Sequence, residues 1–218
     1  MENSYTYKSP QTLSKWVITF IIISLIFSIA SIIGSMIEWN TYNQYSASDT
    51  FENLAPQDMA KVAAVAVGVH LPKTFFFIVS ILIFLIWIYR VHQNGRALQL
   101  DGSIYAPGWS VAFYLIPLVN LVLPLLSLLH LHKGGAKRAD IQKSEEPPKV
   151  WLIYAWWILF WSSYLLSIPG NLGAEEETFA QLKGEIPSFL ASEVIYFIAG
   201  VFLIFIVKKV TKVQEKAA

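Results

Sequence analysis

The 218-residue sequence contains no cysteine, which excludes disulfide bonds, thiolate metal sites and cysteine nucleophiles. Charged residues are scarce, at 14% of the chain, whereas a soluble domain usually carries about 25%. No sign of charge predominates, because the formal net charge is +1, so nucleic acid is not expected as a partner. Hydrophobic residues make up 55% of the chain. Because so few charges cannot cover a globular surface in water, the composition predicts a lipid bilayer as the main partner.

Five long apolar runs occupy most of the sequence, at residues 16–37, 74–89, 109–131, 150–168 and 189–207. A helix needs about 20 mostly apolar residues to cross a hydrocarbon core of about 30 Å. The first run is longer than the apolar part of a secretory signal peptide and lacks a small-residue cleavage pattern, so we expect an uncleaved span. The runs predict an all-α fold, a polytopic membrane helix bundle that forms a single integral membrane domain over residues 1–218.

The charges between the runs predict the side of the membrane on which each loop lies. Lysine and arginine are enriched in cytoplasmic loops near the ends of spans. They predominate in the N-terminal tail (1–13), after the second and third runs, and in the C-terminal tail (208–218). Carboxylates predominate in the other two loops, where the sequence also predicts short separate helices at 56–70 and 174–183. We therefore expect both termini in the cytoplasm.

The third run does not fit this pattern as an ordinary span, since it would place two basic loops on opposite sides of the membrane. Pro117 and Pro124 each remove a backbone donor, and Asn120 between them is costly in lipid unless it is paired. These features predict four transmembrane helices plus a re-entrant or broken third hydrophobic segment. The alternative is a proline-kinked crossing, which gives five transmembrane helices.

One stretch of about 40 residues carries a family resemblance. Its residues, in order, are Trp87, Tyr89, Arg90, Asn94, Ala97, Leu98, Pro107, Gly108, Trp109, Ser110, Val111, Ile116, Pro117, Asn120, Leu121 and Pro124. Their order and spacing resemble the bacterial membrane family catalogued as domain of unknown function 4328. The chain departs from the family pattern at Leu123, where an arginine is typical. The resemblance implies a multi-pass protein of the bacterial plasma membrane and implies no activity.

A row of small polar residues marks one face of the first run. Ser24, Ser28, Ser31 and Ser35 recur at helical spacing, so they share a face. Small hydroxyl residues let membrane helices approach closely, which favours a helix-packing face. A polar pore lining is the alternative interpretation.

Few other polar residues fall within the apolar runs. Glu193 is the only acidic one, which makes it a candidate proton or cation site. Alternatively, if the last helix begins at Pro187, Glu193 lies near its N-terminus, where the helix dipole favours a carboxylate. Arg90 and Asn94 share a helix face and, with Asn120, are candidates for a polar cluster. The alternative is a snorkelling arginine and a helix-capping asparagine.

No catalytic, metal-binding or phosphate-binding motif is present, so we expect neither an enzyme nor a cofactor. A membrane enzyme acting on lipid would lack both a nucleophile and a metal site. The sequence favours a membrane scaffold or partner-binding subunit, in contact with another membrane protein or a second copy. The alternative is a small transporter or channel with a polar path around the third segment. The candidate binding residues are Arg90, Asn94, Pro117, Asn120, Pro124 and Glu193.

Overall fold

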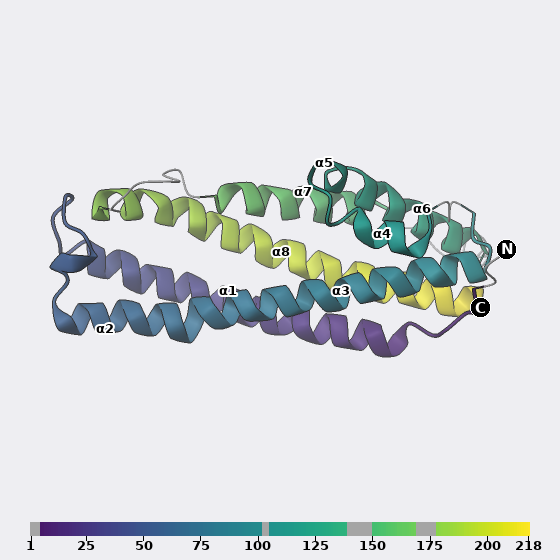
Figure 1. Ribbon diagram of the computed structural model, residues 1–218, viewed down its shortest axis with the longest axis horizontal. Coiled ribbons are helices and arrows are strands. Elements are labelled where there is room, and N and C mark those ends of the chain that lie inside the picture. Colours follow the sequence, from purple (N-terminus) through teal and green to yellow (C-terminus); the bar gives the residue numbers. More distant parts are fainter. Residues whose placement is uncertain (1–4, 102–104, 139–149, 169–177) are drawn as a thin grey trace. The chain divides into compact units, whose positions relative to one another are not determined.

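The computed structural model describes residues 5–101, 105–138, 150–168 and 178–218, and every regular element within them is a helix. In chain order these are α1 (Gln11–Tyr42), η1 (Phe51–Asn53), α2 (Pro56–Val65), η2 (Ala66–His70), α3 (Leu71–Ala97), α4 (Pro107–Ala112), α5 (Pro117–Asn120), α6 (Leu123–Arg138), α7 (Trp151–Leu166) and α8 (Phe179–Ala217) (Figure 1). The all-α prediction is confirmed.

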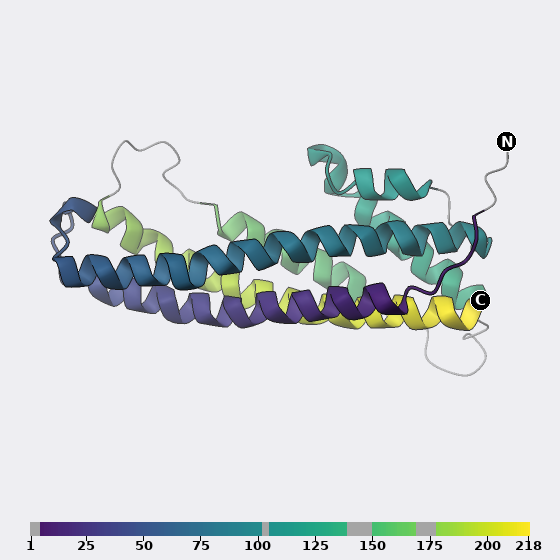
Figure 2. The same cartoon turned by 60° about the horizontal axis from the view of Figure 1, so that its bottom comes forward.

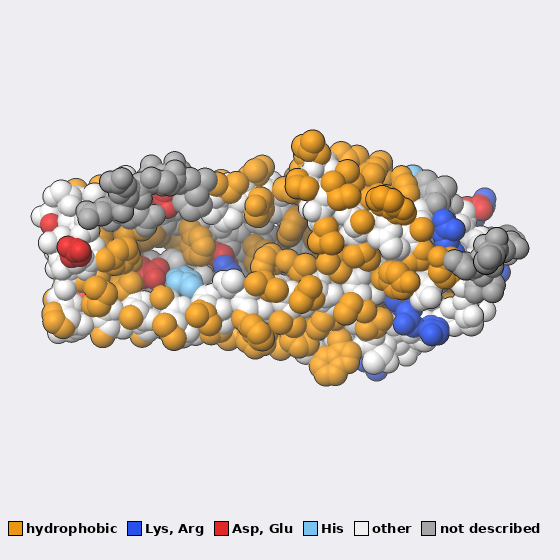
Figure 3. All heavy atoms as spheres, in the orientation of Figure 1, with side chains coloured by type: hydrophobic (Ala, Val, Ile, Leu, Met, Phe, Trp, Pro, Cys, Tyr) orange, Lys and Arg blue, Asp and Glu red, His pale blue; other side chains and the backbone are white. Residues whose placement is uncertain are grey.

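Three helical stretches in the described part of the chain are long and apolar enough to cross a membrane. They are Gln11–Tyr42, Pro56–Ala97 and Phe179–Ala217. α7 is also apolar, but its 16 residues extend only about 24 Å at about 1.5 Å per residue. Large apolar side chains remain exposed along these helices, as the hydrophobic atoms in Figure 3 show. The helices are therefore compatible with a membrane protein.

The chain divides into two compact units that share the long helices. Unit 1 consists of Met1–Ile21, Val79–Trp157 and Val201–Ala218, and unit 2 consists of Ile22–Ile78 and Ile158–Gly200. α1, α3, α7 and α8 contribute residues to both units.

In unit 2, the predicted separate helix over 56–70 is wrong, because α2 and η2 continue into α3 without a break. The π-helical turn η2 ends two residues before Pro72, which has no N–H and whose ring would clash with the carbonyl of Gly68 in a regular α-helix. At the end of this turn the Leu71 N–H donates to the Ala66 carbonyl, five residues earlier, which is the π-helical pattern. The wider turn accommodates the proline and places His70 on the side of α1.

The loop between α1 and α2 closes one end of unit 2. The Phe179 N–H donates to the Asp49 carbonyl at 2.9 Å and the Ala180 N–H to the Ala47 carbonyl at 3.0 Å. These bonds satisfy orphan donors in the first turn of α8. The Phe179 ring is fully buried and stacks on Tyr42, with ring centroids 4.9 Å apart. α8 therefore begins at Phe179, and the prediction that the last helix begins at Pro187 is wrong.

In unit 1, the third apolar run forms three short helices instead of one long one (Figure 2). Pro117 is the first residue of α5, and Pro124 is the second residue of α6. Proline is tolerated in a first helical turn, where its missing N–H would have no partner in the helix. The prolines thus start new helices at these positions.

The two ends of this segment meet in unit 1. Lys137, in the last turn of α6, forms an ion pair with Asp101, which follows α3. Gly134 lies so close to the Asp101 backbone that a Cβ at residue 134 would overlap the Asp101 carbonyl oxygen. The chain from 101 to 137 therefore leaves this point and returns to it.

Candidate functional site: a buried ion pair between two cavities

The four serines on one face of α1 (Ser24, Ser28, Ser31 and Ser35) are buried, and three of them make polar contacts in unit 2. The four side chains are at most 2% exposed. The Ser24 hydroxyl lies 2.7 Å from the Tyr196 hydroxyl, and the Ser28 hydroxyl donates to Glu193 Oε2 at 2.6 Å. Ser31 Oγ lies 3.2 Å from His70 Nδ1. α1 therefore presents hydroxyl groups to α8 and to the π-helical turn.

Glu193 is the centre of this polar cluster. It lies in the interior of α8, 4% exposed, and forms an ion pair with Lys73 near the start of α3. The Lys73 ammonium also lies 5.1 Å from the centroid of the Phe189 ring, one turn before Glu193 on α8. Intramembrane ionisable groups are rare and pair with one another when they occur. The pair thus joins α3 to α8 through charges that have little access to water.

A second ionisable pair adjoins the first. His70 Nε2 lies 3.3 Å from Glu38 Oε2, and the other ring nitrogen faces Ser31. α1, η2, α3 and α8 therefore each contribute a titratable side chain to unit 2. None of these groups belongs to a cluster of three or more metal-ligand residues, and no such cluster occurs elsewhere in the described residues.

Two cavities lie on either side of Lys73. The acidic cavity, of about 380 Å³, is lined by Ser35, Glu38, Tyr42, His70, Lys73, Thr74, Leu166, Ser167, Ile168, Leu182, Glu185, Ile186, Ser188 and Phe189. The ion-pair cavity, of about 350 Å³, is lined by Lys73, Thr74, Phe77, Phe160, Ser163, Tyr164, Ser167, Phe189, Ser192, Glu193 and Tyr196. Figure 3 shows acidic, histidine and lysine side chains in a hollow of the apolar surface.

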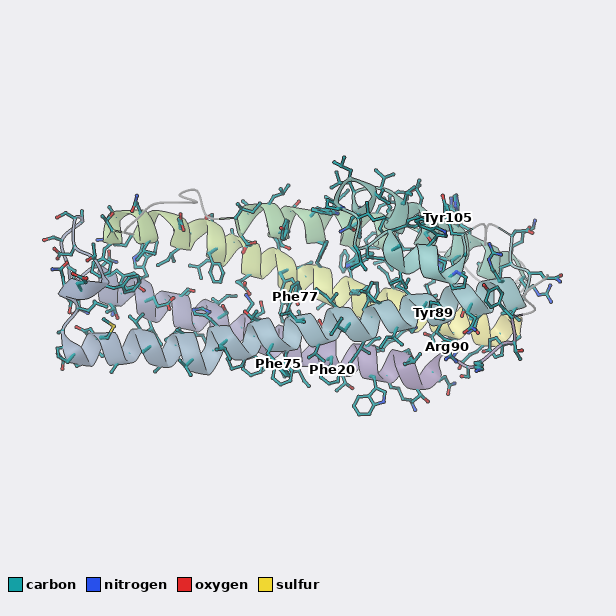
Figure 4. All side chains as sticks on the ribbon, in the orientation of Figure 1. Phe20, Phe75, Phe77, Tyr89, Arg90 and Tyr105 are labelled. Atoms are coloured by element: carbon teal, nitrogen blue, oxygen red, sulfur yellow. The ribbon has the colours of Figure 1, made fainter. Side chains whose placement is uncertain are left out.

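The cavities share a short boundary formed by Lys73, Thr74, Ser167 and Phe189. Phe77 follows Lys73 by one helical turn, and its ring centroid lies 5.8 Å from that of Tyr196 (Figure 4). Both cavities have the size and the mixed polar and apolar lining of small-molecule sites.

The remaining predicted polar residues belong to unit 1 and do not form one cluster. Asn94 is fully buried, and its amide accepts from the Lys8 N–H at 3.0 Å and donates to the Lys8 carbonyl at 2.8 Å. It also donates to Gln214 Oε1 at 3.2 Å, and Gln214 donates to the Val91 carbonyl at 2.7 Å. Asn94 thus ties α3 to α8 and to the N-terminal segment, and it does not hydrogen-bond to Asn120.

Arg90 and Asn120 each contain a buried polar atom, Nε and Oδ1 respectively, with no hydrogen-bond partner among the described residues. Figure 4 places Arg90 on α3 next to Tyr89. Asn120 is the last residue of α5, and its backbone N–H donates to the Ile116 carbonyl at 2.7 Å. Pro117 is exposed and Pro124 is buried.

The Asp101–Lys137 pair has a clear electrostatic signature. The hydrogen bond and charge of Lys137 hold the pKa of the Asp101 carboxyl below its usual range, and Asp101 raises the pKa of Lys137 in turn. Both side chains are exposed to solvent, which screens the attraction. The pair marks where the two ends of the third segment meet.

Comparison with protein families gives one match. The family model described as a domain of unknown function (DUF4328) matches residues 51–212, about three quarters of the chain. The chain belongs to the DUF4328 family. This confirms the resemblance found in residues 87–124. Comparisons with curated proteins and with solved structures gave no match.

Several residues of the site in this DUF4328 protein were not singled out from the sequence. Lys73, His70 and Glu38 all border apolar runs, where charged residues are ordinary. One signal was available in the sequence. Lys73 directly precedes the second run, and Glu193 lies near the start of the last run; the charge pattern places both of these run ends on the same side of the membrane. The partner of Glu193 lies 120 residues away along the chain, so no local pattern links them.

Proposed function

We propose that this protein is a small transporter of the bacterial plasma membrane that binds its solute in the two cavities of unit 2. The observation that carries the proposal is the Lys73–Glu193 ion pair on helices apolar enough to cross a membrane: Lys73 lines both cavities, and Glu193 lines the ion-pair cavity. Buried charges beside a cavity are expensive, and in membrane helices they mark solute and ion pathways. A scaffold needs no such pair.

The topology that we propose has four crossings, with the third segment re-entrant and both termini in the cytoplasm. Support comes from the contact of Asp101 with Gly134 and Lys137, which brings the two ends of the segment together. It also comes from the division of the segment into α4, α5 and α6, because α4 and α5 are far too short to cross and α6 ends in a polar, basic stretch that includes Lys133, Lys137 and Arg138, whereas α7 is apolar along its length. Five crossings would place Arg90 and Arg96, after the second run, and the basic residues of 133–149, after the third, on opposite sides of the membrane.

Cysteine labelling tests this topology, because the natural chain has no cysteine. Single cysteines at Ser103 and Ser144 should resist a membrane-impermeant thiol reagent in intact cells and react after lysis. A cysteine at Ser48, in the loop between α1 and α2, should react in intact cells and serves as the positive control. Labelling of one of the first two positions from outside would establish five crossings.

A matched pair of adjacent cysteines tests the transporter proposal. Thr74 lines both cavities, whereas Phe75 is 58% exposed on α3 and lines neither of them (Figure 4). If the cavities are hydrated, Thr74→Cys reacts with a small impermeant thiol reagent, because thiolate forms in water. Phe75→Cys, facing lipid, stays unreactive. Equal resistance of both cysteines would refute a solute pathway.

The alternative function is the scaffold or partner-binding subunit expected from the sequence. It would be favoured by a stoichiometric membrane-protein partner that co-purifies with the chain, together with an unreactive Thr74→Cys. A reactive Thr74→Cys and solute flux in proteoliposomes that is lost in Glu193→Gln would favour the transporter. Glu52→Gln is the matched control for flux, since Glu52 is exposed and lines neither cavity.

A further inference from the structure

We infer that the acidic cavity takes an organic cation with an apolar or aromatic body. The inference rests on the proposed function and names the solute class of the same site. It begins with the charges around the cavity. The ionisable side chains that line it are Glu38, Glu185, His70 and Lys73.

The positive charge of Lys73 is already neutralised by Glu193. Its ammonium is paired with Glu193 in the neighbouring cavity and lies against the face of Phe189. Two carboxylates therefore remain for the acidic cavity itself. Glu38 has His70 within 3.3 Å. Glu185 is half-buried and has no ion pair among the described residues. An anionic solute would meet uncompensated negative charge here, whereas a cation would neutralise it.

A buried hydroxyl points to the same ligand. Ser35 lines the acidic cavity and is 2% exposed. Buried polar groups are normally satisfied by protein, water or ligand. A hydroxyl in this lining can accept a hydrogen bond from an ammonium group. The carboxylates of Glu38 and Glu185 supply the negative charge that attracts the cation.

The remaining lining residues indicate that the uncharged part of the solute is apolar. Leu166, Ile168, Leu182 and Ile186 are apolar, and the Phe189 ring borders the cavity. Aromatic rings attract cations through their π faces, and Phe189 already does so with Lys73. A cavity of about 380 Å³ accommodates a small organic molecule and is far larger than a bare metal ion requires. A hydrophobic body with one positive charge fits both parts of the lining.

Two probe ions of the same size and shape and opposite charge test the inference. Tetraphenylphosphonium is the cation and tetraphenylborate the anion. Equilibrium dialysis against the full chain in lipid nanodiscs, with protein-free nanodiscs subtracted, measures protein-bound probe. We expect saturable binding of the cation, and an affinity about tenfold lower in Glu185→Gln, which corresponds to about 1.4 kcal/mol. Glu52→Gln, exposed and outside both cavities, should bind like the natural chain.

Melting temperatures of the variants show that each is folded. Saturable binding of the anion with an unchanged or higher affinity in Glu185→Gln would overturn the cation assignment. If neither ion binds, the cation assignment is overturned too. Neither result bears on whether the cavities are hydrated, since reactivity of Thr74→Cys decides that separately. An unreactive Thr74→Cys would instead remove the proposed function on which the inference rests.

Discussion

Replacing Glu193 by glutamine is the most direct perturbation of the site in unit 2. Glutamine keeps the length of the side chain and can still accept the hydrogen bond that Ser28 donates at 2.6 Å. It removes the negative charge that faces Lys73, whose side chain is only 18% exposed. The variant therefore isolates the effect of the charge from that of packing.

Removal of one partner from a buried ion pair typically costs about 3–5 kcal/mol, because the other charge is left without compensation. The cavities on both sides of Lys73 give its ammonium some access to water, so we expect a loss near 3 kcal/mol, the lower end of that range. For a chain of this size that corresponds to a fall in melting temperature of about 6–12 °C. The tryptophans allow thermal unfolding to be followed by intrinsic fluorescence in detergent.

The double variant Lys73→Met/Glu193→Gln decides whether the charge is responsible. It removes both charges and should recover most of the stability lost by Glu193→Gln alone, since apolar replacements of buried pairs are often neutral. Glu52→Gln should melt like the natural chain, because Glu52 is exposed. A Glu193→Gln variant that melts within about 2 °C of the natural chain would refute the reasoning, as would a double variant less stable than Glu193→Gln.

Three further predictions concern other contacts. Gly134→Ala should destabilise the chain by about 1–3 kcal/mol, because the new Cβ overlaps the Asp101 backbone. Gly184 has open space around it, so Gly184→Ala should be neutral or stabilising by up to about 1 kcal/mol. Thermal melts of the two variants test this difference. Asn94→Ala should cost about 1–3 kcal/mol, since it leaves buried backbone groups of Lys8 without partners, and faster hydrogen exchange at Lys8 would detect their release. Lys137→Met should return the pKa of Asp101 toward its ordinary value. In the natural chain this depressed pKa gives a stabilising contribution that is present above the unfolded-state pKa and is lost as pH falls through the folded-state value. In the variant the two pKa values should coincide, so this contribution should be absent at every pH. Carboxyl-carbon NMR titration would show the shift, and an unchanged pKa would contradict it.

The sequence predicted the helices well because each apolar run is long enough to decide its own structure. Pro117 and Pro124 also revealed in advance where the third run is interrupted, because proline acts on its own backbone. The start of α8 was missed. A proline at residue 187 is a common first residue of a helix, and the signal that overrides it is the long-range pairing of Phe179 with Asp49.

The candidate site was only partly visible for the same reason. Glu193 and the serine row stood out because they are polar residues within apolar runs. Their partners, Lys73 and His70, come from segments distant in sequence, and only the folded chain brings them together. The continuous helix from α2 to α3 was missed because π-helical turns have no recognised sequence pattern, so residues before Pro72 looked like a separate element.

The contact between Asn94 and the N-terminal segment has an evolutionary consequence. Both hydrogen bonds to residue 8 involve its backbone, so the Asn94 side-chain amide pairs with residue 8 as a neighbouring peptide group would. Any residue other than proline can therefore occupy position 8 without loss of these bonds. Lys8 and Gln214 both lie outside the residues matched by the family model, whereas Asn94 lies within them. The side chain at position 8 can therefore change without loss of the contact, provided that an amide remains at position 94, whereas the bond to Gln214 depends on the side chain of that residue.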